Sequence, residues 1–358
     1  MSKGIPAMWM RGGTSKGLYF LKNDIPTDIE KRRDFLLSVF GSPDTLQING
    51  VGGGNPLTSK VAIVSKSKRP NIDVDYLFLQ VAVDKYVVSS RQNCGNILAG
   101  IAPFALERGL IKPEKTKTTI RIFMENSKQV AVSTVETPNS NLTYEGDTYI
   151  DGVTSPGAPI SLEFLNIEGS LCGQLLPSGS AKDEVDGYSL TMIDNGMPCV
   201  IIEADQLGLK GNETGDELEK NAIVRDQLES LRLKCGEIMN LGDVQEKTVP
   251  KMTIVSKPLL KGMINTRTFI PHKCHQSIGV FGAISVATAC LLEGTPANNM
   301  AAIPGGEKKV CSIEHPSGKM QVLVELRNKK IKSASILRTA RKLFDGVVFP
   351  HENSMKAT

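Results

Sequence analysis

The sequence has few of the residues that usually mark a metal site or a disulfide framework. Its 358 residues include four His, one Trp and 5% aromatic residues, and no C-x-x-C pair occurs. Seven Cys at irregular spacing do not form a disulfide framework, so we expect free thiols and a cytoplasmic location. His272, Cys274 and His275 form a close group but lack a fourth ligand at motif spacing, so we expect no metal.

Strong charge and long apolar runs are also missing. The formal net charge is +4, and no basic block with interleaved aromatic residues appears, so a nucleic-acid partner is not expected. The longest apolar run, residues 278–292, contains Ser285 and Thr288 and is too short to span a bilayer. Residues 1–6 lack the apolar core of a signal peptide. We therefore expect neither nucleic acid nor membrane as a partner.

The two halves of the chain carry the same landmarks in the same order. Ile-Val-Ser-Lys occurs in residues 63–66 and again in residues 254–257, which aligns Lys60 with Lys251. The glycine turn of residues 11–17 has a counterpart in residues 194–198, and each turn precedes an apolar strand-like run. A chain of this length usually forms two domains, and the order of these landmarks predicts that the domains are related by a repeat.

Periodicity predicts the elements between these landmarks. Apolar residues recur at helical spacing in residues 28–40 and 217–239, which predicts two helices. Strands are predicted by alternation at residues 75–83, 118–123, 130–135, 148–150 and 160–164. The runs 97–106 and 278–292 are apolar almost throughout, so each must be buried on every face. We expect an α+β fold of two pseudo-symmetric domains, each a curved, mostly antiparallel sheet around one central apolar helix.

A stretch rich in Gly, Ser and Asp at residues 178–187 predicts the boundary between the domains. The first domain is expected to cover residues 1–182 and the second residues 183–334. The tail, residues 335–358, resumes strand and helix patterning and is expected to return to the first domain.

Residues 91–96 are the most informative stretch, because Asn93, Cys94, Gly95 and Asn96 lie where an apolar helix is predicted to begin. The first N–H groups of a helix have no intrahelical acceptor and favour negative charge, so they suit a thiolate or a bound carboxylate. The alternative interpretation is a buried structural Cys, which is the more common case for an arbitrary Cys. The second apolar helix offers Ser277 at the corresponding place.

If the halves are pseudo-symmetric, the two apolar helices direct their N-termini at a shared cleft. Such a cleft would receive a molecule with carboxylates at both ends. Lys60 precedes an apolar strand, residues 61–64. Its side chain either extends to solvent or is desolvated, and a desolvated Lys can serve as a general base near neutral pH. Lys251 carries the same two alternatives.

Several segments together resemble the PrpF-type isomerases, over essentially the whole chain. They are residues 10–17, 56–61, 73–78, 93–96, 271–275 and 314–318. This family comprises 2-methylaconitate cis-trans isomerase, 3-methylitaconate isomerase and 4-oxalomesaconate tautomerase, on the diaminopimelate-epimerase-like fold. The resemblance implies that fold, a small-molecule polycarboxylate substrate, no cofactor, and an active site with Ser15, Lys60 and Cys94.

An allylic isomerisation of an unsaturated tricarboxylate needs a base, donors for the developing charge, and an acid that returns the proton. We expect Lys60 to be the base, the Gly95 and Asn96 N–H groups to hold the oxyanion, and Cys94 or water to deliver the proton. The further candidates for substrate binding are Arg11, Thr14, Asn55, Arg267, His275 and Ser277. Arg11 is an equally good surface residue. A homodimer is one assembly consistent with these expectations.

Two other functions stay open. The cofactor-independent epimerases of the diaminopimelate-epimerase-like fold place a Cys at the start of both central helices. In this sequence Gly279 stands where the second Cys belongs. An amino-acid racemase or epimerase is therefore disfavoured. A non-catalytic partner of an aconitase-like enzyme would need neither Lys60 nor Cys94.

Within the family, the expected substrate is 4-oxalomesaconate. The segments that resemble the oxalomesaconate tautomerases are residues 41–44, 60–64, 97–100 and 104–110. Methylaconitate and methylitaconate present the same anionic groups around the same allylic unit. A methyl group in an apolar pocket decides only about 1–3 kcal/mol of specificity.

Overall fold

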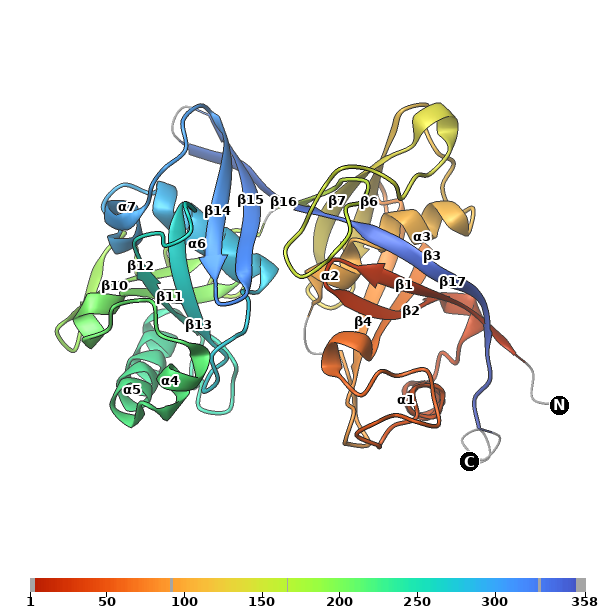
Figure 1. The fold of residues 1–358 in the computed structure, drawn as a ribbon, viewed down its shortest axis with the longest axis horizontal. Helices are drawn as coiled ribbons and strands as arrows, with labels where there is room; N and C mark the ends of the chain where they lie inside the picture. Colours follow the sequence, from red (N-terminus) through yellow and green to blue (C-terminus); the bar gives the residue numbers. More distant parts are fainter. Residues whose placement is uncertain (1–3, 91–92, 166, 328–329, 352–358) are drawn as a thin grey trace. The chain divides into compact units, whose positions relative to one another are not determined.

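The computed structural model describes residues 4–90, 93–165, 167–327 and 330–351. The chain divides into two compact units, Met1–Leu165 with Leu337–Thr358, and Asn166–Ile336 (Figure 1). The stretch 178–187, where we expected the domain boundary, lies inside the second unit and leads into its first strands. No helix among the described residues is long and apolar enough to cross a membrane.

The first unit is a mixed sheet with helices on both faces. Its strands are β1 (Ile5–Gly12), β2 (Ser15–Leu21), β3 (Lys60–Lys66), β4 (Val74–Val81), β5 (Val88–Ser89), β6 (Lys117–Met124), β7 (Gln129–Glu136), β8 (Ile160–Leu165) and β17 (Ala340–Val348). Its helices are α1 (Ile29–Phe40), α2 (Gly95–Leu98) and α3 (Ile101–Glu107), with short 3-10 helices η1 (Lys22–Asp24), η2 (Pro56–Thr58) and η3 (Pro138–Ser140).

The second unit repeats this plan. Its strands are β9 (Asp183–Val185), β10 (Tyr188–Asp194), β11 (Pro198–Glu203), β12 (Lys251–Ser256), β13 (Ile264–Phe269), β14 (Lys308–His315), β15 (Gly318–Arg327) and β16 (Lys330–Arg338), whose last two residues are assigned to the first unit. Its helices are α4 (Gly215–Lys220), α5 (Ala222–Ile238), α6 (Val280–Leu291) and α7 (Pro296–Met300), with the 3-10 helix η4 (Ala204–Leu207).

Strand pairing confirms the repeat that the sequence predicted. The first sheet runs β17-β1-β2-β3-β4-β6-β7-β8 and is parallel at β2–β3 and β4–β6. The second runs β9-β10-β11-β12-β13-β14-β15-β16 and is parallel at β11–β12 and β13–β14. Lys60 opens β3 opposite Gly17, and Lys251 opens β12 opposite Cys199. The two lysines therefore occupy equivalent places in the two units.

Each sheet curves around one buried helix. In the second unit α6 contacts β10 and β11 and also β14 and β15, so strands from both halves of the sheet meet the same helix. In the first unit α2 contacts β1, β2 and β3, while α3 contacts β3 and β7. The other face of each sheet is covered by an amphipathic helix, α1 or α5, which packs on apolar residues of the strands. The predicted fold class is confirmed.

Local sequence signals explain where the helices begin and end. Asp28 caps α1 by accepting a hydrogen bond from the Lys31 N–H, and Gly41 ends this helix in the left-handed conformation. The predicted helix 217–239 is two helices, because Asn221 ends α4 and caps α5 through the Val224 N–H. The predicted helical part of the tail is wrong, because residues 340–348 form β17 beside β1. The predicted strand 148–150 is reduced to one bridge, Thr148 to Gly157.

The first apolar helix is broken at Gly100, between α2 and α3. Pro103 has no N–H to donate to Ala99, so the helical ladder is interrupted there. The Tyr19 hydroxyl donates instead to the Ile97 carbonyl, at 2.6 Å. A Cβ on Gly100 would lie 2.4 Å from the Tyr19 hydroxyl oxygen, so only glycine fits. Tyr19 therefore fixes the position of α2, which carries the candidate site.

We expect Tyr19→Phe to lower the free energy of unfolding of the first unit by about 1 kcal/mol, because the buried Ile97 carbonyl loses one of its two donors and keeps only the Gly100 N–H. Urea unfolding followed by tyrosine fluorescence and circular dichroism measures this change. Tyr86→Phe is the control, since its hydroxyl bonds Asp34 at the surface. Equal stability of Tyr19→Phe and wild type would show that the hydrogen bond does not hold α2.

Candidate active site

The turn between β1 and β2 lies directly against the start of α2. A Cβ on Gly12 would fall 2.3 Å from the Asn96 carbonyl oxygen, and one on Gly13 would fall 2.2 Å from Asn96 Oδ1. Gly13 also has φ +50°, a conformation that favours glycine. The Asn96 amide donates to Thr14 Oγ1 at 3.0 Å. The two glycines thus allow the turn to reach the helix that follows Cys94.

Cys94 lies at the N-cap of α2, as the sequence predicted, and its side chain caps no backbone N–H. The N–H groups of Gly95 and Asn96 are in the first turn, where no intrahelical acceptor exists. Burial and, to a lesser extent, the charge of Cys94 raise the pKa of Tyr19 and of Tyr76 well above the usual value. Both tyrosines therefore stay protonated and can only donate or accept as hydroxyls.

Ser15 opens β2 beside this helix start. Its side chain is buried, and its Oγ has no hydrogen-bond partner among the described residues. A buried hydroxyl without a partner is unusual in a folded protein, because burying such a group without a hydrogen bond costs about 1–3 kcal/mol of stability. Ser15 therefore offers a free donor and acceptor next to Cys94's helix.

Lys60 is 7% exposed and is held by a neutral partner. Its Nζ donates to Gln80 Oε1 at 2.7 Å and lies 5.3 Å from the centroid of the Phe78 ring. The Gln80 Nε2 group donates to the carbonyls of Pro56 and Ser59, which orients Oε1 toward the lysine. In the part of the chain that the structure describes, no carboxylate forms an ion pair with Lys60. The sequence did not single out Gln80, whose role depends on its register opposite Lys60.

Arg11 and Asn55 are both engaged in local hydrogen bonds. The Arg11 Nη1 group donates to the carbonyl of Gly13 and to Thr339 Oγ1, at 2.9 and 3.0 Å. Burial, and then the charge of Arg341, lower the pKa of Arg11. Asn55 caps η2 by accepting from the Leu57 N–H at 2.8 Å. These contacts shape the turn and the loop before Lys60, and the roles of both residues in substrate binding stay predictions.

Three predicted binding residues belong to the second unit. The Arg267 Nε and Nη1 groups donate to the Glu213 carbonyl and to Asn265 Oδ1, at 2.7 and 2.9 Å. His275 Nδ1 accepts from the Ser277 N–H at 2.8 Å. Burial and the charge of Lys251 lower the pKa of His275, so this imidazole is neutral at pH 7.

Lys251 is the counterpart of Lys60 in the second unit. Burial lowers its pKa from 10.5 to about 8, and the nearby Cys199 opposes that shift. The α6 N-cap is Gly279, where a Cβ would meet no atom within 4 Å. The second unit therefore has a lysine at the place of Lys60 but glycine at the place of Cys94.

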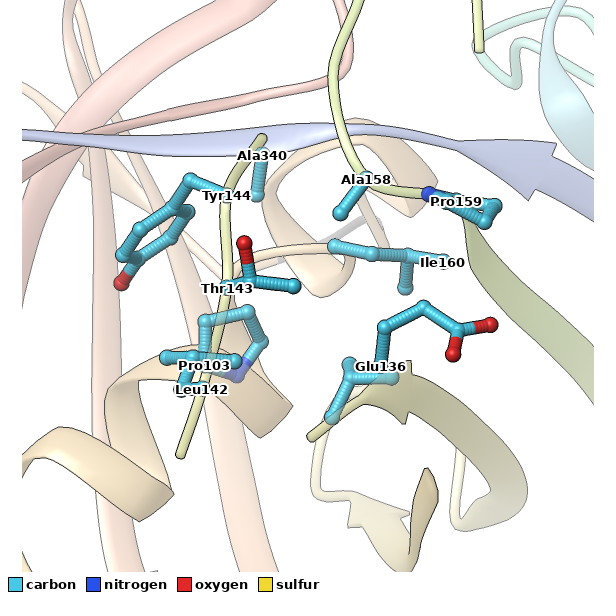
Figure 2. A pocket seen from close by; sticks show the side chains of 10 residues that line it. Pro103, Glu136, Leu142, Thr143, Tyr144, Ala158, Pro159, Ile160 and Ala340 are labelled. Carbon is cyan, nitrogen blue, oxygen red and sulfur yellow. The ribbon is translucent and has the colours of Figure 1, made fainter. Parts of the chain in front are cut away.

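The first unit therefore brings together Ser15, Thr14, Cys94 and Asn96 around one turn, with Lys60 on the adjoining strand. A cleft shared by the two halves stays a prediction. Arg91 and Gln92 lie outside the described residues. Within the described residues, no three His, Cys, Asp or Glu side chains are grouped closely enough to hold a metal ion. The small cavity in Figure 2 lies elsewhere in this unit, between Pro103, Tyr144 and Ile160, and no candidate residue lines it.

Comparison with known proteins adds the family. Residues 2–351 match the model of the PrpF protein family. The chain is 57% identical to a (4E)-oxalomesaconate Δ-isomerase of Novosphingobium sp. strain KA1 (96% of this chain, 97% of the relative). It is 52% identical to a 4-oxalomesaconate tautomerase of Pseudomonas putida strain KT2440 (96% and 95%). A solved methylitaconate-Δ-isomerase is 30% identical with a TM-score of 0.90 (100% and 98%).

A solved protein described as a probable proline racemase from Agrobacterium radiobacter K84 shares the fold alone, at 12% identity and a TM-score of 0.52 (96% and 92%). These comparisons extend over nearly the whole chain, and they agree with the repeated fold and with the helix that starts after Cys94. The chain belongs to the PrpF family of isomerases.

We expect Cys94 to be the thiol that iodoacetamide alkylates fastest. The other six cysteines are buried, and burial raises the pKa of Cys172, Cys199 and Cys235 to about 12 and of Cys274 and Cys311 to about 11. Cys94 is only partly buried and lies at a helix start. Timed labelling with peptide mass spectrometry measures the seven rates. If Cys94 is inert while Cys172 or Cys311 reacts, this expectation is wrong.

Proposed function

We propose that this isomerase moves a proton between allylic carbons of an unsaturated tricarboxylate, without a cofactor, and that its substrate is 4-oxalomesaconate. The observation that carries the reaction class is the buried Lys60, whose Nζ is bonded to a neutral amide oxygen. Support for the substrate comes from the two relatives above 50% identity, both named for oxalomesaconate.

Lys60 is the proposed general base. A neutral amine can remove a proton from the γ-carbon, and the electron pair of that C–H bond then shifts into the conjugated system as a dienolate. Gln80 Oε1 accepts a hydrogen bond from the lysine in both its neutral and its charged form, so the side chain keeps its position through the transfer. The same ammonium or a second acid then protonates the α-carbon and completes the double-bond shift.

The start of α2 is the proposed oxyanion site. The Gly95 and Asn96 N–H groups stabilise the charge that develops on the carboxylate or keto oxygen, which is usually the largest single contribution to catalysis. Cys94 or a water molecule returns the proton. Arg11, Thr14, Asn55, Arg267, His275 and Ser277 are the proposed substrate-binding residues. A homodimer and a cytoplasmic location are likewise proposals.

A second candidate is isomerisation of methylaconitate or methylitaconate, which the solved methylitaconate-Δ-isomerase supports. A two-thiol racemase receives no support from the second unit. There the N-cap of α6 is Gly279, while Cys274 is buried and its backbone N–H donates to Glu219 Oε1. The substrate assay below separates the first two possibilities.

We expect Lys60→Met to lower turnover at least about a hundredfold, the effect of removing a general base. Proton NMR in D2O with 4-oxalomesaconate measures both turnover and exchange of the substrate C–H protons. Lys66→Met is the matched control, because Lys66 lies on the same strand but is exposed. Activity of Lys60→Met within about threefold of wild type would place the base on another residue.

The proposed substrate is tested by parallel assays with 4-oxalomesaconate, 2-methylaconitate and 3-methylitaconate. We expect the highest kcat/KM with 4-oxalomesaconate, by at least about tenfold. A tenfold preference for either methyl compound would overturn the substrate and leave the isomerase class intact. The absence of turnover with all three would overturn the proposed reaction itself.

A further inference from the structure

Arg338 is a buried arginine whose donors are mostly unused. It is the last residue of β16, it belongs to the first unit, and it is 6% exposed. Its Nη1 group donates to the adjacent Leu337 carbonyl at 2.9 Å. Its Nε is buried and has no acceptor among the described residues.

Arg232 shows how this chain satisfies a buried arginine that is purely structural. That guanidinium is fully buried, and its Nε and Nη2 donate to the Glu229 carboxylate at 2.7 Å each. Its Nη1 donates to three backbone carbonyls, those of residues 244, 247 and 249. A buried guanidinium is costly without such partners. Arg338 has no ion pair with a carboxylate within the described residues, so its charge is left uncompensated.

The one ionisable group that raises the pKa of Arg338 is Cys94, while burial lowers that pKa to about 10. Arg338 is therefore still a cation at neutral pH, and it lies within electrostatic range of the Cys94 thiol. The sequence could not indicate that Arg338 is near Cys94, because the two residues belong to separate segments of the first unit, with the whole second unit between them in chain order.

The backbone beside Arg338 is fastened to the turn that carries Ser15. The Gly13 N–H donates to the Thr339 carbonyl at 2.9 Å, and Arg11 Nη1 donates to Thr339 Oγ1 at 3.0 Å. In the sheet, Gly12 pairs with Ser15 on one side and with Ala340 on the other. The guanidinium with its unpaired Nε and the unpartnered Ser15 hydroxyl are thus carried by two segments that are hydrogen-bonded to each other.

We propose that Arg338 is a substrate-binding residue whose guanidinium, together with the Ser15 hydroxyl, binds one carboxylate of the substrate beside Cys94. A guanidinium and a carboxylate form paired, charge-assisted hydrogen bonds, and the planar fork of arginine has no equivalent in lysine. This inference rests on the proposed function in one respect, that the substrate carries carboxylates.

The experiment measures binding without turnover. In the Lys60→Met background, propane-1,2,3-tricarboxylate is titrated by calorimetry into the protein with Arg338 intact, with Arg338→Met and with Arg338→Lys. We expect Kd to rise about 10- to 100-fold in both Arg338 variants, the loss of a charged hydrogen-bonded pair. Arg225→Met, at an exposed position of α5 in the second unit, is the control and should leave Kd unchanged.

A second measurement separates binding from an effect on the thiol. The rate at which neutral iodoacetamide alkylates Cys94 is compared between wild type, Arg338→Met, which removes the positive charge, and Arg338→Lys, which keeps it and guards against loss of folding. An unchanged Kd in Arg338→Lys and Arg338→Met overturns the proposal. If the alkylation rate then falls, Arg338 acts on Cys94 instead, and if it does not, Arg338 is structural.

The outcomes for the proposed function are distinct. Wild-type turnover of 4-oxalomesaconate with an unchanged Kd in the variants would overturn the role of Arg338 alone. Weaker tricarboxylate binding in the variants, without wild-type turnover of any of the three substrates, would support Arg338 and overturn the proposed reaction. Absence of tricarboxylate binding to the protein with Arg338 intact would overturn the role of Arg338, and wild-type turnover would still decide the proposed reaction.

Discussion

The close approach of the Gly12–Gly13 turn to Asn96 is the constraint on which the site depends. No side chain larger than hydrogen fits at either glycine, because the Asn96 carbonyl and amide oxygens occupy the space. The contact places Ser15 and Thr14 next to the start of α2, and Thr339 fastens the same turn from the opposite side. A similar contact lies behind Lys60, where a Cβ on Gly17 would fall 2.3 Å from the Lys60 carbonyl oxygen.

The repeat explains how the two units share a plan but differ in chemistry. Both sheets place a lysine at the start of the third core strand, and both wrap a buried apolar helix. The difference is at the helix start, where the first unit has Cys94 and the second has Gly279. In both units the turn is hydrogen-bonded to the central helix: the Asn96 amide of α2 donates to Thr14 in the first unit, and the Asn195 amide of the turn donates to Thr288 Oγ1 at 2.8 Å in the second. The duplicated fold thus has a thiol at the start of one central helix and none at the start of the other. This arrangement suits a proton shift better than an inversion that uses two thiols.

Elements with strong periodicity could be predicted from the sequence. The apolar run at residues 280–291 must be buried wherever it lies, and the order of glycine turns and strands fixes the repeat without any knowledge of contacts. Cys94 and Lys60 could also be singled out, because each stands at the boundary between a polar and an apolar segment. The break at Gly100 was missed although Pro103 carries a local signal for it, and the Tyr19 hydroxyl that reaches the Ile97 carbonyl from a distant strand could not be foreseen. Gln80 and Arg338 were missed for the same reason: nothing local distinguishes them from surface residues.

The first unit is built from both ends of the chain, whereas the second unit is one continuous segment. During translation the second unit can therefore pair its strands as they emerge. The first unit cannot complete its sheet until residues 337–348 leave the ribosome. Until then β1 has an unpaired edge, which can pair with another chain and aggregate. Thr339 arrives with the same segment and then fastens the Gly13 turn. The candidate site is thus completed only by residues that follow the whole second unit in chain order, so a polypeptide released before them cannot contain a finished site.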